Sequence, residues 1–179
     1  DIKFFEKEFG GIMPLEILID TKKDKGVMKL STLKKMDKIN ETIETFPELS
    51  KPISVVNLIK YTKQAYYNGN PKYYQLPTSQ EQNYIFSYTK NSNSDAGMLK
   101  NFVDSTGRYA RITTFMKDIG TDKMDVIQER LKAVIAKEFP AEKYSVSITG
   151  KALVFIKGTN YLINNLVFSL SLAILLIAL

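Results

Sequence analysis

The feature that most constrains this chain is its C-terminal segment, in which twelve of the last fourteen residues, 166–179, are apolar. No charged residue occurs from Gly158 to Leu179. A helix that crosses a bilayer core needs about 20 mostly apolar residues, whereas about 10–14 are more typical of a buried core helix. The segment has neither the polar stripe of a helix packed on one face nor a polar or glycine cap. We therefore predict the start of a transmembrane helix, with a core helix packed into its own domain as the alternative.

The composition limits both the size of the domain and its partners. Roughly 150 residues precede the apolar segment, which suits one domain that buries about two-thirds of its unfolded surface. The formal charge is +6, but only three of the 25 basic residues are arginines, and the lysines alternate with acids. A nucleic-acid surface more often has a dense, arginine-containing basic patch, so we predict no nucleic-acid partner. Because the chain begins at Asp1 and ends within the apolar segment, we expect it to be part of a longer protein.

The chain contains no cysteine and no histidine. Their absence excludes disulfides, thiol nucleophiles, histidine-dependent triads and Cys/His metal sites within the chain. A hydrolase would have to use carboxylates, lysine, serine or tyrosine. Paired acids such as Glu41 and Glu44 fall on a predicted helix face, where solvation is the expected role. We therefore predict no enzyme activity, no catalytic, cofactor-binding or metal-binding residue, and no cofactor.

The first third of the chain predicts alternating helices and strands. Residues 1–9 predict a helix that ends at a pair of glycines, and residues 14–20 predict a strand with apolar residues on one face. A helix follows over residues 31–46, with Ser31 as its N-cap. Residues 52–56 predict a short strand that continues into a second helical stretch, to about residue 67.

The middle of the chain is rich in tyrosine. Seven of the ten tyrosines fall between residues 61 and 88, namely Tyr61, Tyr66, Tyr67, Tyr73, Tyr74, Tyr84 and Tyr88. Glycine, asparagine and proline interrupt this region, which predicts two short helices joined by an irregular segment. The second of these helices is expected at 79–89, and a loop is expected at 91–97.

The remaining elements are a hairpin, a helix and a strand, predicted at 99–103 with 108–117, at 122–139 and at 144–149. The strand at 144–149 has the cleanest alternation of apolar and polar residues in the chain. Gly150 then turns the chain into a helical linker, 151–157, that leads to the apolar segment.

The order of these elements predicts the fold class. Two β-α-β units, at about 14–56 and 98–149, surround a tyrosine-rich helical insert at about 57–97. We therefore predict an α+β, ferredoxin-like split β-α-β domain with inserted helices, followed by a truncated transmembrane helix. The expected division is a helical segment at 1–12, this domain at 13–150, and a linker helix with the start of the transmembrane helix at 151–179.

Two stretches of the sequence resemble a known family. The first, Phe4-Phe-Glu-Lys-Glu-Phe-Gly-Gly-x-x-Pro-Leu-Glu-Ile-Leu-Ile-Asp20, resembles the opening of an extracytoplasmic loop in exporters of the RND superfamily, in the lipid-exporting, MMPL-like branch. The second, Ser145-Val-Ser-Ile-Thr-Gly-Lys-Ala-Leu153, followed by Tyr161-Leu-Ile-Asn-Asn-Leu166, resembles the end of that loop. The likeness covers essentially the whole chain, although the tyrosine-rich region matches only in general character.

The resemblance implies a proton-driven pump with two homologous halves, each with a large periplasmic loop that forms porter domains for hydrophobic or amphiphilic substrates. The residues that couple transport to protons lie in later helices, outside this chain. The chain would lie at the inner membrane, with residues 1 to about 157 in the periplasm. Its partners would be the rest of the transporter, especially the periplasmic loop of the other half, and the lipid bilayer. Whether the protein forms a homo-oligomer, and which half of the transporter contains this loop, are left open.

A membrane-tethered binding or sensor domain with a single transmembrane helix would have a similar C-terminal pattern, and composition does not separate it from a porter domain. Within the porter interpretation, the candidates for contact with substrate are Tyr66, Tyr67, Tyr73 and Tyr74. Aromatic rings with a polar hydroxyl suit a hydrated passage for amphiphiles. The alternative is that these rings pack the inserted helices onto the sheet.

Overall fold

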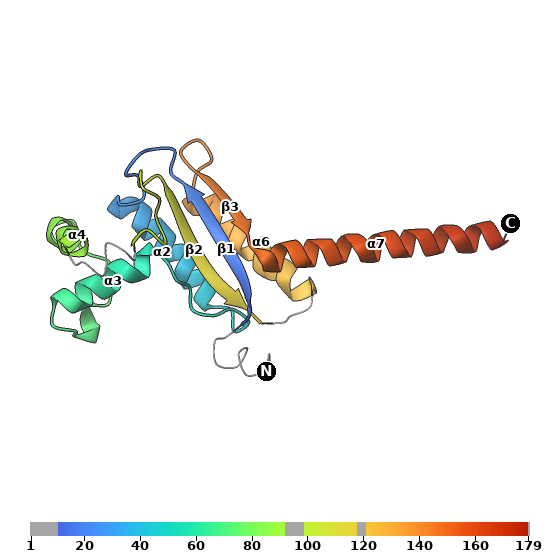
Figure 1. Ribbon diagram of the computed structural model, residues 1–179, viewed down its shortest axis with the longest axis horizontal. Coiled ribbons are helices and arrows are strands. Elements are labelled where there is room, and N and C mark those ends of the chain that lie inside the picture. Colours follow the sequence, from blue (N-terminus) through green and yellow to red (C-terminus); the bar gives the residue numbers. More distant parts are fainter. Residues whose placement is uncertain (1–10, 92–98, 118–120, 179) are drawn as a thin grey trace.

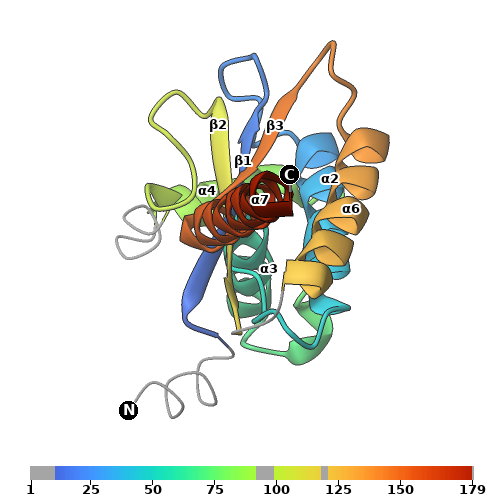
Figure 2. The ribbon, with the colours of Figure 1, turned by 90° about the vertical axis from the view of Figure 1, so that its right-hand side faces the viewer.

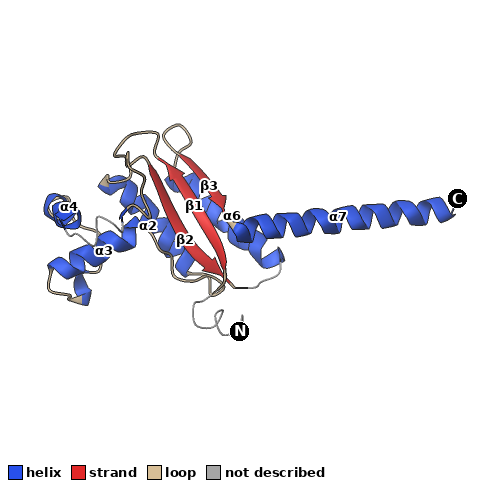
Figure 3. Ribbon diagram, viewed as in Figure 1, coloured by secondary structure: helices blue, strands red, loops and turns tan. Residues whose placement is uncertain are grey.

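The computed structural model describes residues 11–91, 99–117 and 121–178 (Figure 1). Over these residues the chain forms a three-stranded antiparallel sheet and five α-helices. The chain is therefore a mixed α/β protein, and its C-terminal helix extends away from the rest (Figure 3). The helix predicted at 1–9, and all but the first residue of the loop predicted at 91–97, lie outside the described residues.

The sheet is built around its first strand. Strand β1 (Met13–Asp20) lies between β2 (Tyr109–Met116) and β3 (Ser145–Thr149), and both neighbours are antiparallel to it. The β1–β2 pairing runs from Met13 opposite Met116 to Asp20 opposite Tyr109. The β1–β3 pairing is shorter and begins with Glu16 opposite Thr149. Three of the predicted strands are thereby confirmed.

The strand predicted at 52–56 is wrong, because helix α3 (Val55–Tyr66) begins inside it. The preceding residues nevertheless run along the free edge of β2, with isolated bridges between Leu49 and Met116 and between Ile53 and Thr113. Pro52 has no N–H group to donate to a ladder, and Ser54 occupies the N-cap position of α3. The segment before α3 therefore pairs with β2 at separate residues and does not form a continuous strand.

The strand predicted at 99–103 is also wrong. The backbone N–H groups of Phe102 and Val103 both donate to the carbonyl oxygen of Leu99, at 3.0 and 2.9 Å, which is a helical turn. A single bridge between Val103 and Ala110 is the remnant of the expected hairpin. Local turn bonds satisfy backbone groups that a strand would have paired with β2.

Two helices cover one face of the sheet, α2 (Leu30–Glu44) and α6 (Thr121–Glu138) (Figure 2). The predicted cap of α2 is wrong, since Lys29 occupies the N-cap position and Ser31 lies inside the helix. The helices and the sheet share one core, whose fully buried large side chains include Leu15, Ile17, Ile19, Leu33, Met36, Ile39, Ile43, Ile112, Met116 and Met124. Burying each such side chain contributes about 1.5–3 kcal/mol, so this layer supplies most of the hydrophobic stabilisation.

The insert contains α3, the short 3-10 helix η1 (Pro71–Tyr73) and α4 (Gln82–Asn91). The second predicted helix of the insert is thus confirmed, with its start displaced by a few residues. Both α3 and α4 lie at the end of the molecule opposite the C-terminal helix (Figure 1).

Helix α7 (Lys151–Ala178) is continuous, so the predicted linker and apolar segment form one helix. It begins immediately after Gly150, whose φ of +116° is in the region that favours glycine. A Cβ atom at this position would lie 2.5 Å from the carbonyl oxygen of Pro14. Glycine at this turn therefore lets the start of α7 pass close to β1.

Replacing Gly150 by alanine is expected to lower the free energy of unfolding by about 3 kcal/mol, because it adds both an unfavourable φ and a clash with β1. The measurement is urea unfolding of the whole chain in mild detergent, followed by circular dichroism. Gly69→Ala is the matched control, since Gly69 also has a positive φ, +76°, but an added Cβ would meet nothing within 4 Å. The control should lower the free energy of unfolding by about 1 kcal/mol. Equal decreases in the free energy of unfolding for the two variants would contradict the close approach at Gly150.

Candidate functional site

The first candidate site is the tyrosine cluster of the insert, defined here as Tyr66, Tyr67, Tyr73 and Tyr88. The rings of Tyr67 and Tyr73 are stacked, with centroids 4.1 Å apart. Tyr66 meets Tyr67 edge-on at 5.2 Å and Tyr88 edge-on at 5.6 Å. Aromatic pairs at such separations attract one another beyond their burial. The cluster therefore joins α3, η1 and α4.

The structure brings together three of the four tyrosines that the sequence singles out. The fourth, Tyr74, has a different neighbour, because its hydroxyl accepts a long hydrogen bond of 3.5 Å from the amide of Asn57 in α3. Tyr66, Tyr74 and Tyr88 are each between 43% and 45% exposed. Tyr67 and Tyr73 are half-buried. The cluster thus has an inner stacked pair and an outer aromatic surface that is open to a ligand.

The inner pair is held by a network centred on Glu81. This carboxylate accepts hydrogen bonds from Lys63 Nζ at 2.8 Å, from the Tyr67 hydroxyl at 2.9 Å and from the backbone N–H of Thr78 at 2.8 Å. The Lys63 side chain is 3% exposed, so its charge has little contact with water. The hydrogen bond from Lys63, followed by that from the Thr78 backbone, lowers the pKa of Glu81 to about 2.

Sequence reasoning missed this network, although part of it has a recognisable spacing. The Glu81 N–H donates to the Thr78 hydroxyl at 3.3 Å while the Glu81 carboxylate accepts from the Thr78 N–H. This reciprocal pair is a capping box, and it lies directly before α4. The link to Lys63 had no sequence signal, because the two residues are 18 positions apart.

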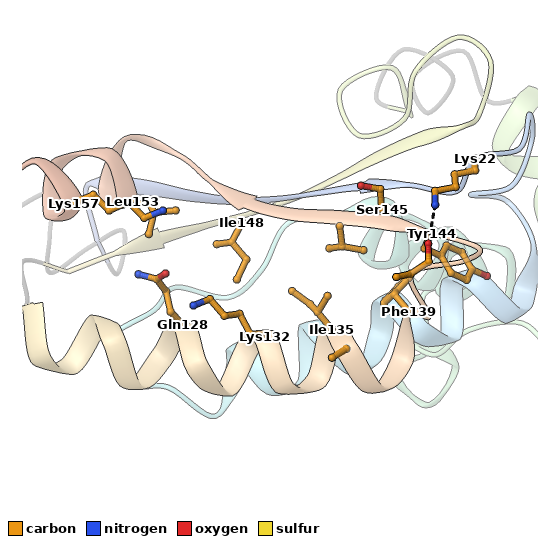
Figure 4. A pocket seen from close by; sticks show the side chains of 13 residues that line it. Lys22, Gln128, Lys132, Ile135, Phe139, Tyr144, Ser145, Ile148, Leu153 and Lys157 are labelled. Atoms are coloured by element: carbon orange, nitrogen blue, oxygen red, sulfur yellow. Dashed lines mark hydrogen bonds between the residues drawn. The ribbon is translucent and has the colours of Figure 1, made fainter.

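The second candidate site is a groove between α6 and β3 that reaches the first turns of α7 (Figure 4). Its volume is about 590 Å³. Gln128, Lys132 and Ile135 extend from α6 towards β3, and Ile148 extends from β3 towards α6. Most of the floor is apolar, with half-buried Ile135, Val146 and Ile148. The groove therefore offers a long apolar surface that is open to solvent on one side.

The two ends of the groove differ. At one end Phe139 and Tyr144 meet edge-on at 5.1 Å. At the other end lie Leu153 and Lys157 of α7 (Figure 4). The groove thus has an aromatic end and an end formed by the helix that carries the apolar segment.

All of the charged residues that line the groove are lysines, Lys22, Lys132 and Lys157; none of the described lining residues is acidic. Lys22 Nζ donates to the carbonyl oxygen of Ala141 at 2.7 Å, which fixes its position. Lys132 forms an ion pair with Glu129 at 2.9 Å, and both side chains are more than half exposed. Exposed pairs of this kind are weak, so Lys132 can exchange its partner for a ligand anion.

This groove was not predicted from the sequence. The sequence feature that could have indicated the groove is the spacing of Gln128 and Lys132, which are four residues apart on the side of α6 that faces β3. Both are polar residues beside the buried apolar stripe that contains Ile127 and Leu131. No group of three or more acidic residues that could hold a metal ion occurs in the described ranges.

Within α7, residues Lys157–Ala178 are long and apolar enough to cross a membrane, and none of this segment is buried against the domain. A core helix would bury such a surface. Its exposed large apolar side chains include Leu162, Leu166, Phe168, Leu170, Ile174, Leu176 and Ile177. This arrangement is consistent with membrane association.

No protein-family model matches the chain, and no curated protein matches it at a significant level.

Replacing Glu81 by glutamine is expected to lower the free energy of unfolding by about 2–3 kcal/mol at neutral pH, because it leaves the Lys63 ammonium without its carboxylate. The pKa of Glu81 is lowered from 4.5 to about 2, so its contribution is complete above pH 4.5 and is lost as the pH falls through 2. Denaturant unfolding between neutral pH and pH 2 measures this: the difference between the wild type and Glu81→Gln should shrink over that interval.

The matched control is Glu129→Gln, which removes the carboxylate of an exposed pair with Lys132. This variant should change the free energy of unfolding by less than about 0.5 kcal/mol. A difference between the wild type and Glu81→Gln that stays constant down to pH 2 would contradict the assigned role of the Glu81 carboxylate.

Proposed function

We propose that this chain is the extracytoplasmic porter domain of a proton-driven exporter of the RND superfamily, in its MMPL-like branch. In this proposal α7 is the first part of the transmembrane helix that follows the domain, and residues up to about 157 lie on the periplasmic side of the inner membrane. The observation that supports the proposal most directly is the groove between α6 and β3. It is an apolar surface that reaches the first turns of an exposed apolar helix. A substrate that partitions into membranes would meet this surface where it leaves the bilayer.

The topology of the sheet supports the porter fold. In the chain, β1 is followed by α2 and then by the edge segment that bridges β2 at Leu49 and Ile53. Strand β2, α6 and β3 form the second unit, and both helices cover the same face (Figure 2). This order fits a ferredoxin-like split β-α-β domain whose fourth strand is reduced to isolated bridges.

The junction at Gly150 supports a mechanical role. Strand β3 ends at Thr149 and α7 begins at Lys151, so a single residue separates the sheet from the helix. Leu153, in the first turns of α7, is 6% exposed and belongs to the core. A displacement of α7 in the membrane would therefore move the wall of the groove, as an alternating porter requires.

The tyrosine cluster has a separate part in this proposal. It lies at the end of the domain remote from α7 (Figure 1), and its outer rings are exposed. We assign it to contact with substrate or with the periplasmic loop of the other half of the transporter. No catalytic step is assigned to the domain.

The alternative is a membrane-tethered binding or sensor domain. The single candidate span among the described residues favours it, because one helix is sufficient to tether a domain. The two functions differ in energy coupling, since a pump moves its substrate at the expense of the proton gradient and a tethered module does not.

The experiment that separates them is dye efflux from cells that produce the complete gene product containing this chain. We expect preloaded Nile red to leave these cells faster than control cells, and a protonophore to abolish the difference. Ala136→Trp, which fills the groove from α6, should slow efflux by about fivefold or more. Ala133→Trp is the matched control, an exposed residue of the same helix outside the groove lining, and should leave efflux unchanged.

Efflux that does not depend on the protein or on the proton gradient would exclude the exporter and favour the tethered domain. Equal slowing by the two tryptophan variants would remove the groove from the substrate path.

A further inference from the structure

The charge and the position of the groove together indicate the chemistry of a ligand. Lys157 is the first residue of the apolar span, and it lies one helical turn after Leu153, which is part of the groove wall. A lysine at the start of a transmembrane helix places its ammonium group at the level of the lipid headgroups. The end of the groove formed by α7 therefore lies next to the headgroup layer once α7 is in a membrane.

From Lys157 the groove leads along β3 over apolar residues. Ile148 of β3 and Ile135 of α6 extend towards each other's elements, and Phe139 and Tyr144 lie at the far end (Figure 4). Val146 of β3 also lines the groove. The volume of about 590 Å³ falls in the range of about 300–1,000 Å³ that is typical of sites for one small ligand. The groove is therefore suited to a single acyl chain.

Lys132 gives this path its second cation. It extends from α6 into the groove between the two ends, and its ion pair among the described residues is the exposed one with Glu129. With Lys22 at the aromatic end, the described lining has three cations and no anion. A neutral or zwitterionic lipid would bring no net negative charge to these cations, whereas an anionic headgroup would complement them.

We propose that the groove binds an anionic phospholipid taken from the leaflet in which α7 begins. One acyl chain lies along Ile135, Val146 and Ile148, and the headgroup phosphate is held by Lys157 and Lys132. The bilayer is the source of the ligand because the wall of the groove and the membrane span are parts of one helix. This inference names the ligand class of the groove, and it rests on the proposed function only in requiring that α7 lies in a membrane.

The test is photo-crosslinking of the full chain in phosphatidylcholine nanodiscs. Two probes carry the same diazirine-labelled acyl chain, one with a phosphatidylglycerol headgroup and one with a phosphatidylcholine headgroup. Mass spectrometry then locates the adducts. We expect phosphatidylglycerol to label the groove residues of α6 and β3 about 25-fold more than phosphatidylcholine, since each of the two lysines near the anionic headgroup contributes about a fivefold preference.

Two matched double variants distinguish binding in the groove from a general attraction of anionic lipid to positively charged residues. Lys132→Gln with Lys157→Gln should reduce groove labelling by phosphatidylglycerol to the phosphatidylcholine level. Lys123→Gln with Lys151→Gln removes the same charge from the same two helices, outside the groove lining, and should leave labelling unchanged. Circular dichroism checks that each variant is folded, which is expected because all four lysines are exposed.

Equal groove labelling by the two headgroups would overturn the proposal, as would equal loss in the two double variants. If a small excess of free palmitate, added before illumination, prevents labelling of the groove by phosphatidylglycerol, the ligand is a fatty acid and the phospholipid proposal is overturned. Adducts on the apolar part of α7 report insertion separately. Their absence would refute the membrane location, whereas α7 adducts without groove adducts would refute only the groove site. The assay contains no proton gradient, so its outcome is independent of efflux.

Discussion

The structure depends on the burial of one face of β1 while both of its edges are paired. Leu15, Ile17 and Ile19 are completely buried beneath α2 and α6, and the strand is bonded on one side to β2 and on the other to β3. Both partner strands come from the second half of the chain, so the sheet forms only by long-range pairing. At one end of the β1–β2 pair, Arg108 donates to both carboxylate oxygens of Asp20, at 2.7 and 2.8 Å, and lowers the pKa of Asp20 to about 2.

The same strand connects the core to the proposed membrane end of the molecule. Gly150 lies against the backbone of Pro14 and Glu16, and α7 leaves the domain from this point. The groove lies on the α6 side of β3, next to the root of α7. The tyrosine cluster lies at the opposite end, held by Glu81 and Lys63 (Figure 1). Our proposals therefore place exchange with lipid at one end of the domain and contact with a partner or substrate at the other.

Much of this fold follows from periodicity, because a strand with one buried face must alternate. That rule predicts β1 and β3 closely. It fails at 52–56, where a proline removes a ladder donor and Ser54 starts a helix. The Lys63–Glu81 pair and the groove depend on the distance between elements that are remote in sequence, which periodicity does not encode. The three-residue spacing of Thr78 and Glu81 is typical of a capping box and can be recognised in the sequence. The pairing of Glu81 with Lys63 cannot.

We propose that α7, one continuous helix that leaves the sheet at Gly150, enters a bilayer at Lys157. The chain has no cysteine, so single cysteines along residues 153–178 can each carry a nitroxide label without background. Electron paramagnetic resonance in liposomes then compares collisions with oxygen, which concentrates in the bilayer, and with a water-soluble nickel complex. We expect nickel access at the start of this series and, beyond residue 157, rising oxygen access with a helical period. Nickel access or protein protection throughout 162–176 would contradict it.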